Sequence, residues 1–410
     1  MSLRHDCLHI LERWFKGRDH AVDLLEEASQ NLGWTSRDRA LAQGILYGIL
    51  RNLRRFDYWI QEWRGDGQLD PELRSVLLIG MSQLFALGLA EHAAVNETVD
   101  LATSGRGLVN ALLRRALREK NQMELAERNW PPARRYSHPD WMFKRWESRY
   151  GADNAAALCA WNQMPAPIFI RANRLIPGAV EEIEKTAKAM PDDGSFYQCE
   201  SMPLPWLSQG IAYIQDPSTW AACALLDPQP GEMVLDLCAC PGGKTAILAQ
   251  MMGNKGQIWA CDSRSDRMAR LRNNLKRLGV TNTTAAVFDS TRPGTPPPWG
   301  PQLADRILLD VPCSNTGVIR RRVDVRWRLT PNDFAEQAKL QFALIRSSLR
   351  FLKPGGVLVY STCSLETEEN RDMVQKVLDE IPGLTLDDRV ERLPFRDQRD
   401  GAYAARFKKR

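Results

Sequence analysis

The chain has 410 residues, more than one hydrophobic core usually serves, so two or three domains are expected. A hydrophobic content of 44% and a charged content of 26% are typical of a soluble globular protein, and no run reaches the about 18 apolar residues that a membrane span needs. The net charge of +5 permits a nucleic-acid partner without requiring one. The N-terminus lacks the apolar core and cleavage site of a secretory signal, so we expect a cytoplasmic protein with mostly reduced cysteines.

Residues 1–132 are predicted to form an all-α bundle. Apolar residues recur at helical spacing over 37–63, and Thr35 and Asp38 are placed like a capping box. Pro71 introduces a second apolar helix over 73–89, and shorter helices are expected over 93–102 and 108–120. Residues 133–214 are predicted to be a small α+β connecting subdomain, with helices over 141–150 and 180–189 and a strand over 168–171.

From residue 215 to residue 410 strands alternate with helices, which predicts a parallel, doubly wound α/β sheet. The expected strands are 233–237, 257–261, 285–288, 306–311 and 357–360, and the expected helices are 245–252, 265–278 and 331–352. Ligands of such sheets bind at the carboxyl ends of the strands, and here each strand ends in a polar or reactive residue.

The turn after the first of these strands, Cys238-Ala-Cys-Pro-Gly-Gly-Lys-Thr245, opens a helix and has paired glycines that let a ligand approach the backbone. It is neither a dinucleotide turn, which needs Gly-x-Gly-x-x-Gly, nor a phosphate-binding loop, which needs glycine at position 238. Asp262 ends the second strand and suits a ribose diol, and Asp289 ends the third. The alternative for both aspartates is that they cap the helices that follow.

Two cysteines, Cys313 and Cys363, follow strands in short polar turns at the expected ligand edge. A cysteine is often a small buried hydrophobe, but at this edge a nucleophilic thiolate is favoured. No histidine follows His138, so no histidine of the last two thirds can activate a cysteine or serine there. Cys238 and Cys240 have no second close-spaced pair downstream, so no metal site is expected.

Arginines form clusters that are either solvated helix faces or nucleic-acid contacts. The members are Arg51, Arg54 and Arg55, then Arg114, Arg115 and Arg118, then Arg320, Arg321 and Arg322.

The motifs 236–245 (DLCACPGGKT), 310–317 (DVPCSNTG) and 360–364 (YSTCS) resemble those of RNA 5-methylcytosine methyltransferases. Segments 37–51, 93–100 and 108–115 resemble the NusB-like RNA-binding domain, and 400–406 resembles a last strand. In this order the halves are similar to the Sun/RsmB family of ribosomal RNA methyltransferases. The resemblance implies a NusB-like bundle and a Rossmann-like class I methyltransferase domain.

The resemblance also implies residue roles and partners. Asp262 would contact the ribose of S-adenosylmethionine and Asp289 its adenine, while Asp310 would lie between cofactor and cytosine. Cys363 would attack carbon 6 of the cytosine, and Cys313 would help release the enzyme. The turn residues implied to bind the cofactor are Cys238, Ala239, Cys240, Pro241, Gly242, Gly243 and Lys244. The implied substrate is 16S ribosomal RNA before full subunit assembly, bound by a monomer, with Arg320–Arg322 holding phosphates.

Two positions depart from the family pattern: Asn315 stands where glycine is usual, and Cys240 where alanine is commoner. Two alternatives remain at this point. One is a transfer-RNA cytosine methyltransferase with the same catalytic half; the other is a non-enzymatic RNA-binding factor, which would have no need of the two cysteines.

Overall fold

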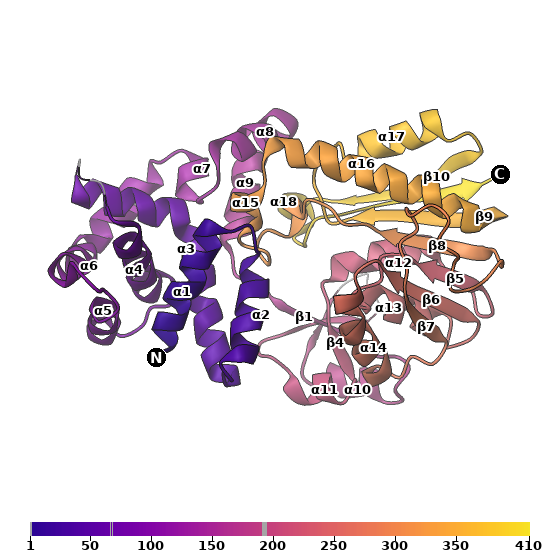
Figure 1. The fold of residues 1–410 in the computed structure, drawn as a ribbon, viewed down its shortest axis with the longest axis horizontal. Helices are drawn as coiled ribbons and strands as arrows, with labels where there is room; N and C mark the ends of the chain where they lie inside the picture. The colour runs from indigo at the N-terminus through magenta and orange to yellow at the C-terminus, as the bar shows by residue number, and fades with distance from the viewer. Residues whose placement is uncertain (1, 66, 68, 191–194) are drawn as a thin grey trace. The chain divides into compact units, whose positions relative to one another are not determined.

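The computed structural model describes residues 2–65, 67, 69–190 and 195–410, and the chain divides into two compact units (Figure 1). The first unit contains the residues up to Pro165 together with Ile319–Leu329, and the second contains Ala166–Val318 and Thr330–Arg410. The chain thus leaves the second unit after Val318, contributes one short segment to the first, and returns at Thr330. Nothing in the sequence indicated that residues 319–329 belong to the first unit.

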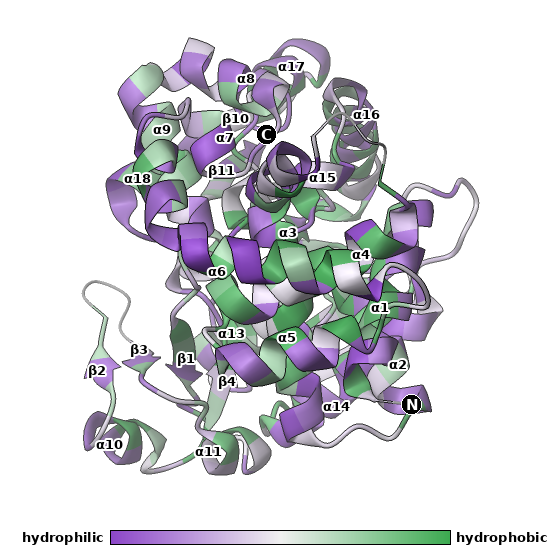
Figure 2. Ribbon diagram, turned by 90° about the vertical axis from the view of Figure 1, so that its left-hand side faces the viewer, coloured by the Kyte–Doolittle hydropathy of each residue, from purple (hydrophilic) through white to green (hydrophobic). Residues whose placement is uncertain are grey.

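The first unit is helical, as predicted. Its core is made by the apolar faces of amphipathic helices, and Figure 2 shows the alternation of apolar and polar residues along α4 and α5. The predicted capping box is present, with the Asp38 N–H donating to Thr35 Oγ1 over 3.1 Å. The helices are α1 (Leu3–Lys16), α2 (Ala21–Asn31), α3 (Ser36–Arg64), α4 (Pro71–Met81), α5 (Glu91–Val99), α6 (Arg106–Arg128), α7 (Pro132–Arg135), α8 (Asp140–Tyr150), α9 (Ala152–Gln163) and α15 (Val325–Arg328). The helix predicted over 73–89 is divided, because a π-helical turn, η1 (Ser82–Ala86), follows α4.

The segment Ile319–Leu329 is built into the core of this helical unit. Val323 is fully buried in the core, and the Trp327 indole donates to the Leu50 carbonyl over 2.7 Å. Asp324 accepts the Ala21 N–H over 2.8 Å and lies 3.1 Å from the His20 ring, so it satisfies a free donor at the start of α2. The segment is therefore a structural part of the unit.

Arg326, one of the arginines of this segment, is fully buried. Its guanidinium donates to the Tyr136, Ser137 and Asn162 carbonyls and to Gln163 Oε1 over 3.0–3.3 Å. Burial, and then the charge of Arg51, lower the pKa of Arg326 to about 9.

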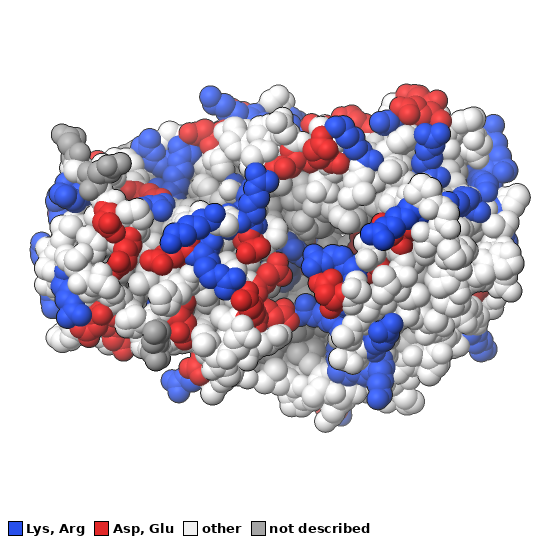
Figure 3. Space-filling model, viewed as in Figure 1, with Lys and Arg blue, Asp and Glu red and all other residues white. Residues whose placement is uncertain are grey.

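Most arginines of the clusters have protein partners. Arg54 pairs with Asp140 over 2.7 Å and Arg55 with Glu127 over 2.5 Å. Arg320 is 2% exposed and its guanidinium lies 4.0 Å from the centre of the Trp161 ring, so the prediction that it holds a phosphate is wrong. Arg322 is exposed. Acidic and basic side chains are intermingled on the face of the molecule that Figure 3 shows.

The second unit begins with a small antiparallel sheet of strand order β2-β3-β1-β4. The helix predicted over 180–189 is shorter, since it ends at Glu184 and residues 188–189 form an edge strand. The elements are β1 (Ile168–Ala172), α10 (Ala179–Glu184), β2 (Lys188–Ala189), β3 (Phe196–Cys199), α11 (Leu204–Ser208) and β4 (Ala212–Ile214). An α+β arrangement was predicted for this stretch.

The remainder of the second unit is a seven-stranded sheet of order β10-β11-β9-β8-β5-β6-β7, and the Rossmann-like α/β fold is confirmed. Its five predicted strands are parallel, and β10 and β11 add an antiparallel edge. The strands are β5 (Met233–Asp236), β6 (Gln257–Asp262), β7 (Thr283–Val287), β8 (Ala304–Asp310), β9 (Leu352–Thr362), β10 (Leu384–Arg392) and β11 (Ala402–Lys409). Before β5 come η2 (Pro217–Thr219) and α12 (Trp220–Leu226), and between the strands lie α13 (Gly243–Met251), η3 (Ser265–Arg267), α14 (Met268–Arg277), η4 (Thr316–Val318), α16 (Pro331–Ser348), η5 (Leu349–Phe351), α17 (Arg371–Glu380) and α18 (Pro394–Asp397).

Alternate residues of the central strands enter two different cores. Ile307 and Leu309 of β8 pack in the same cluster as residues of α16 and α17, whereas Leu308 packs with α12 and α13. Both faces of the sheet are therefore covered, which explains why these strands are apolar throughout. The order of strands reverses between β5 and β8, and a ligand is expected at that switch point.

No helix among the described residues is long and apolar enough to span a bilayer.

The buried guanidinium of Arg326 gives a test of how the helical unit is held together. We expect Arg326→Ala to lower the free energy of unfolding of this unit by about 3 kcal/mol, because several buried carbonyls lose their donors. Urea unfolding followed by tryptophan fluorescence measures the change. Arg322→Ala, in the same segment but exposed, is the control and should shift stability by less than about 0.5 kcal/mol. Equal effects of the two substitutions would contradict this account of the segment.

Candidate active site

The glycine turn connects β5 to α13 at the carboxyl edge of the sheet. Gly242 has φ +102°, and a Cβ at this position would lie 2.8 Å from a methyl carbon of Leu271, so a side chain is excluded on both counts. The Ala239 N–H donates to the Cys261 carbonyl over 2.8 Å and fixes the turn to β6. The turn therefore presents its backbone and the first turn of α13 at this edge.

Four aspartates, each at or just after the end of a parallel strand, act electrostatically on the Cys238 thiol. Burial first, and then the charges of Asp236, Asp310, Asp262 and Asp289, raise the pKa of Cys238 well above its usual value. The four strand ends thus converge on one acidic region. Cys238 remains a neutral thiol there.

Asp236, the innermost of these carboxyl groups, is fully buried. Burial raises its pKa to about 7, although a 2.7 Å hydrogen bond from Thr245 Oγ1 opposes the shift. Its Oδ1 atom is buried without a hydrogen-bond partner among the described residues. An unsatisfied acceptor of this kind marks a place where a bound group is expected to donate.

Asp262 and Asp289 both hold their own loops. Asp262 accepts the Cys240 N–H over 3.3 Å and the Arg264 N–H over 3.0 Å, and so joins the glycine turn to the end of β6. Asp289 accepts from the N–H and hydroxyl of Thr291 over 3.0 and 2.6 Å. Asp289 therefore closes a turn and caps no helix, since β8 is the next element, and a ligand would contact a carboxylate that is already oriented.

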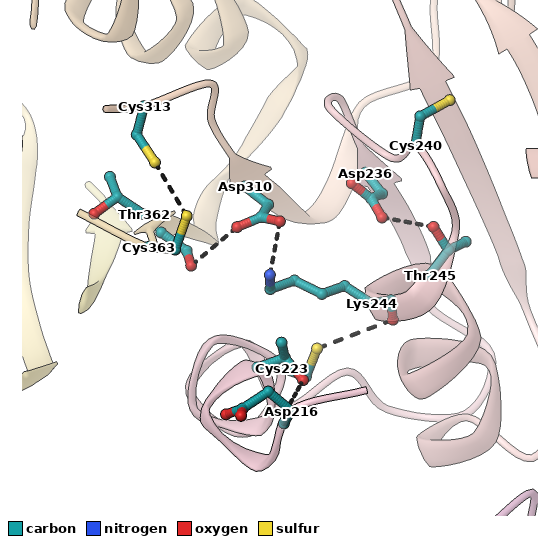
Figure 4. Close-up of polar contacts among 12 residues, drawn as sticks. Asp216, Cys223, Asp236, Cys240, Lys244, Thr245, Asp310, Cys313, Thr362 and Cys363 are labelled. Atoms are coloured by element: carbon teal, nitrogen blue, oxygen red, sulfur yellow. Dashed lines mark hydrogen bonds and ion pairs between the residues drawn. The ribbon is translucent and has the colours of Figure 1, made fainter. Parts of the chain in front are cut away.

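Lys244 points to Asp310 (Figure 4). Its Nζ lies 2.6 Å from Asp310 Oδ2, and Ser361 Oγ donates to Asp310 Oδ1 over 3.2 Å. Burial would lower the pKa of Lys244, but the attraction of Asp310 outweighs it and the pKa is raised. Sequence reasoning grouped Lys244 with the cofactor residues and missed its contact with Asp310, which joins β8 to α13.

The two cysteines meet beside Asp310 (Figure 4). The Sγ atoms of Cys313 and Cys363 are 3.3 Å apart, and Cys363 Sγ lies 3.2 Å from Asn315 Oδ1. The hydrogen bond that Cys313 donates to Cys363, and then burial, raise the pKa of Cys313 well above its usual value. Cys313 is 9% exposed, whereas Cys363 is half-buried.

The unusual Asn315 has a clear structural role. Its φ of +60° lies in the left-handed region, which glycine adopts freely and asparagine tolerates better than most residues. Its amide also donates to the Cys313 carbonyl over 2.8 Å. The substitution therefore keeps the shape of the loop and adds a polar contact to each cysteine.

Among the residues that the structure describes, no group of three or more histidine, cysteine or acidic side chains is placed to hold a metal ion.

Comparisons with known families cover nearly all of the chain. The 16S rRNA methyltransferase RsmB/F family matches residues 223–408, and the NusB family matches residues 1–118. A ferredoxin-like domain of RsmF/B-like methyltransferases matches residues 138–183.

Individual relatives of the chain are named as members of the same methyltransferase family. The chain is 36% identical to a probable ribosomal RNA small subunit methyltransferase B of Synechocystis over 88% of its length and 85% of the relative's. It is 35% identical to ribosomal RNA small subunit methyltransferase B of Yersinia pestis over 94% of both chains.

Among solved structures, PH0851 has a TM-score of 0.76 and 26% identity, with 99% of this chain and 97% of that one covered. A methyltransferase homolog protein from Pyrococcus horikoshii has a TM-score of 0.57 and 30% identity, over 65% of this chain and 94% of that one.

The two thiols should differ in reactivity. With limiting iodoacetamide at pH 8, we expect Cys363 to be alkylated at least about 10-fold faster than Cys313, because burial and a raised pKa keep Cys313 protonated. Peptide mass spectrometry measures both rates. In Cys363→Ala the largest cause of the raised pKa is removed, so Cys313 should react faster than in the unaltered protein. Faster alkylation of Cys313 than of Cys363 in the unaltered protein would contradict this description.

Proposed function

Because the chain belongs to the ribosomal RNA small subunit methyltransferase B family, we propose that it methylates carbon 5 of a cytosine in 16S ribosomal RNA through a covalent adduct of Cys363. The observation that carries the proposal is the pair of thiols, 3.3 Å apart, in the loops that follow Asp310 and its register partner Ser361. Thiol addition is the chemistry that an unreactive pyrimidine carbon requires.

The cofactor of the chain is S-adenosylmethionine. Its hydroxyl and amino groups are donors, and the carboxyl edge of the sheet offers acceptors, among them the unpartnered Oδ1 of Asp236. The residues present therefore fit it. We propose that the backbone of the turn from Cys238 to Gly243 holds it, with Asp262 at its ribose and Asp289 near its adenine. When bound, it supplies an electrophilic methyl group.

Cys363 makes carbon 5 reactive. Its thiolate adds to carbon 6 of the ring, a sulfur–carbon bond forms, and the electron pair of the double bond makes carbon 5 enamine-like. The ring nitrogen takes up a proton from water as the thiolate adds, so the adduct is neutral, and Asp310 accepts a hydrogen bond from the protonated nitrogen. Lys244 and Ser361 hold both oxygens of Asp310, so that the carboxylate is oriented before the base arrives.

Cys313 acts after the methyl group is in place. While Cys363 is free, its hydrogen bond keeps Cys313 protonated. Once Cys363 is bonded to carbon 6 this largest contribution is absent, and Cys313 can lose its proton. Its thiolate then removes the proton from carbon 5, the ring nitrogen returns its proton to water, the double bond between carbons 5 and 6 re-forms, and the Cys363 thiolate leaves.

Access to this site requires an unpaired cytosine. An atom inside an RNA helix cannot reach a thiol at the sheet edge, so the base must come from a single-stranded segment or be extruded. We propose that the NusB-like helical unit contributes binding to the ribosomal RNA.

Substitution of Cys363 and substitution of Cys313 should have different effects on methyl transfer and on the covalent adduct. We expect Cys363→Ala to reduce methyl transfer from labelled S-adenosylmethionine to 16S RNA by at least about 10³-fold and to abolish trapping on 5-fluorocytosine RNA, because the nucleophile is lost. Cys313→Ala should accumulate a protein–RNA adduct on ordinary cytosine RNA, because release is blocked. Denaturing gels and filter counting measure both.

Cys199→Ala, in the small antiparallel sheet, is the matched control and should behave as the unaltered protein. Transfer RNA transcripts are assayed beside 16S RNA, and preferential methylation of transfer RNA would contradict the proposed substrate. Binding of 16S RNA without methyl transfer would instead favour a non-enzymatic factor. Undiminished methylation by Cys363→Ala would overturn the assignment of the nucleophile.

A further inference from the structure

A single buried carboxylate joins the two loops that carry the cysteines. Glu369 is 0% exposed. Its Oε2 atom accepts the N–H of Ser314, the residue after Cys313, over 2.9 Å, and its Oε1 atom accepts the hydroxyl of Ser364, the residue after Cys363, over 2.7 Å. Each oxygen thus holds the neighbour of one cysteine.

Glu369 is itself held in place by Gln341 of α16 and Tyr360 of β9. Gln341 of α16 donates to Glu369 Oε2 over 2.8 Å and to the Pro312 carbonyl over 2.9 Å. The Tyr360 hydroxyl lies 2.6 Å from the Glu369 carbonyl and 2.8 Å from Gln341 Oε1. The position of Glu369 is therefore fixed by the end of β9 and by a helix that packs on the sheet.

Further hydrogen bonds connect the loops directly. The hydroxyl oxygens of Ser314 and Ser364 are 2.9 Å apart, and the Leu365 N–H donates to Thr316 Oγ1 over 2.9 Å. The Gly317 N–H donates to the Cys363 carbonyl over 2.9 Å. Without Glu369 the loops would still touch, but the N–H of Ser314 would be buried without an acceptor, and the amide of Gln341 would keep only the Pro312 carbonyl.

Burying a carboxylate often lowers the stability of the fold relative to an apolar side chain that fills the same space. Burial raises the pKa of Glu369, although the hydrogen bonds from Ser314 and Ser364 oppose this shift. An apolar residue of similar volume often serves stability as well or better than a buried charge. Because the buried Glu369 carboxylate costs stability, its presence indicates that the hydrogen-bond geometry it imposes on the two loops is required.

We propose that Glu369 is a positioning residue, which fixes the separation and direction of the Cys313 and Cys363 thiols by holding the backbone or hydroxyl beside each. The inference rests on the proposed function, in which the two thiols act in turn on carbon 6 and carbon 5 of one ring. Groups that act on adjacent atoms must be held to within about 0.5 Å, and a displacement of about 1 Å can cost about 10²-fold in rate.

The test compares Glu369→Ala with Glu369→Gln and measures the rate at which Cys313 and Cys363 form a disulfide. Diamide oxidises the two thiols to a disulfide and is itself reduced to the hydrazine, so the rate of this reaction reports how often the sulfurs meet. We expect Glu369→Ala to form the Cys313–Cys363 disulfide at least about 10-fold more slowly than the unaltered protein.

Methylation by Glu369→Ala should show kcat lower by about 10²-fold, with KM for S-adenosylmethionine changed less than about 2-fold. Glu369→Gln should stay within about 3-fold in both assays, because the amide oxygen can accept from Ser314 and Gln341 while its NH2 group donates to the Ser364 hydroxyl.

Val377→Ala controls for general destabilisation. Val377 of α17 is fully buried in the core of the same unit and takes part in none of the hydrogen bonds described above between the two loops, so this variant should melt earlier with an unchanged disulfide rate. If Glu369→Ala does not fold, Gln341→Met takes its place and should slow disulfide formation by about 3-fold.

An unchanged disulfide rate in the folded variant overturns the proposal, and so does a loss in Glu369→Gln as large as that in Glu369→Ala. The thiol assay needs neither RNA nor cofactor. Failure of the unaltered protein to methylate any RNA would therefore count against the proposed function and leave this inference to be decided by the disulfide rates.

Discussion

The parallel register of β8 and β9 is the constraint on which the site depends. Asp310 is the register partner of Ser361, so the loops that follow these strands start side by side and carry Cys313 and Cys363 to within 3.3 Å of each other. The same register brings the Ser361 hydroxyl to Asp310, whose other oxygen pairs with Lys244 at the start of α13. A one-residue slip would turn alternate side chains to the opposite face and separate these groups.

The acidic edge of the sheet and the thiol pair are surrounded by different kinds of side chain. Around Cys238 burial, and then the charges of four aspartates, keep a thiol neutral, and the aspartates leave acceptors for a cofactor that brings donors. Around Cys313 and Cys363 the contacts come from amide, hydroxyl and carboxylate groups that fix position. Lys244 and Asp310 lie between the two regions, and their pairing balances a buried positive charge against a negative one.

Much of this fold could be predicted from the sequence, because its long amphipathic helices and apolar strands have strong periodicity. The strand ends at Asp262, Asp310 and Cys363 followed from the same pattern. Long-range contacts could not be predicted: Arg320 belongs to a basic run typical of a solvated face, yet it is buried on Trp161 within the helical unit. Glu369 lies in an acidic, polar stretch that indicates exposure, and only the tertiary fold reveals its burial.

The central claim is that one sulfur atom, that of Cys363, bonds to the pyrimidine. The most direct test is peptide mapping by mass spectrometry of the complex formed by the unaltered protein with 5-fluorocytosine 16S RNA and S-adenosylmethionine. After nuclease and protease digestion, the account predicts a methylated fluorocytidine nucleotide attached to the peptide that contains Cys363. A nucleotide attached to the Cys313 peptide, or no covalent complex while methyl transfer to ordinary RNA proceeds, would contradict it.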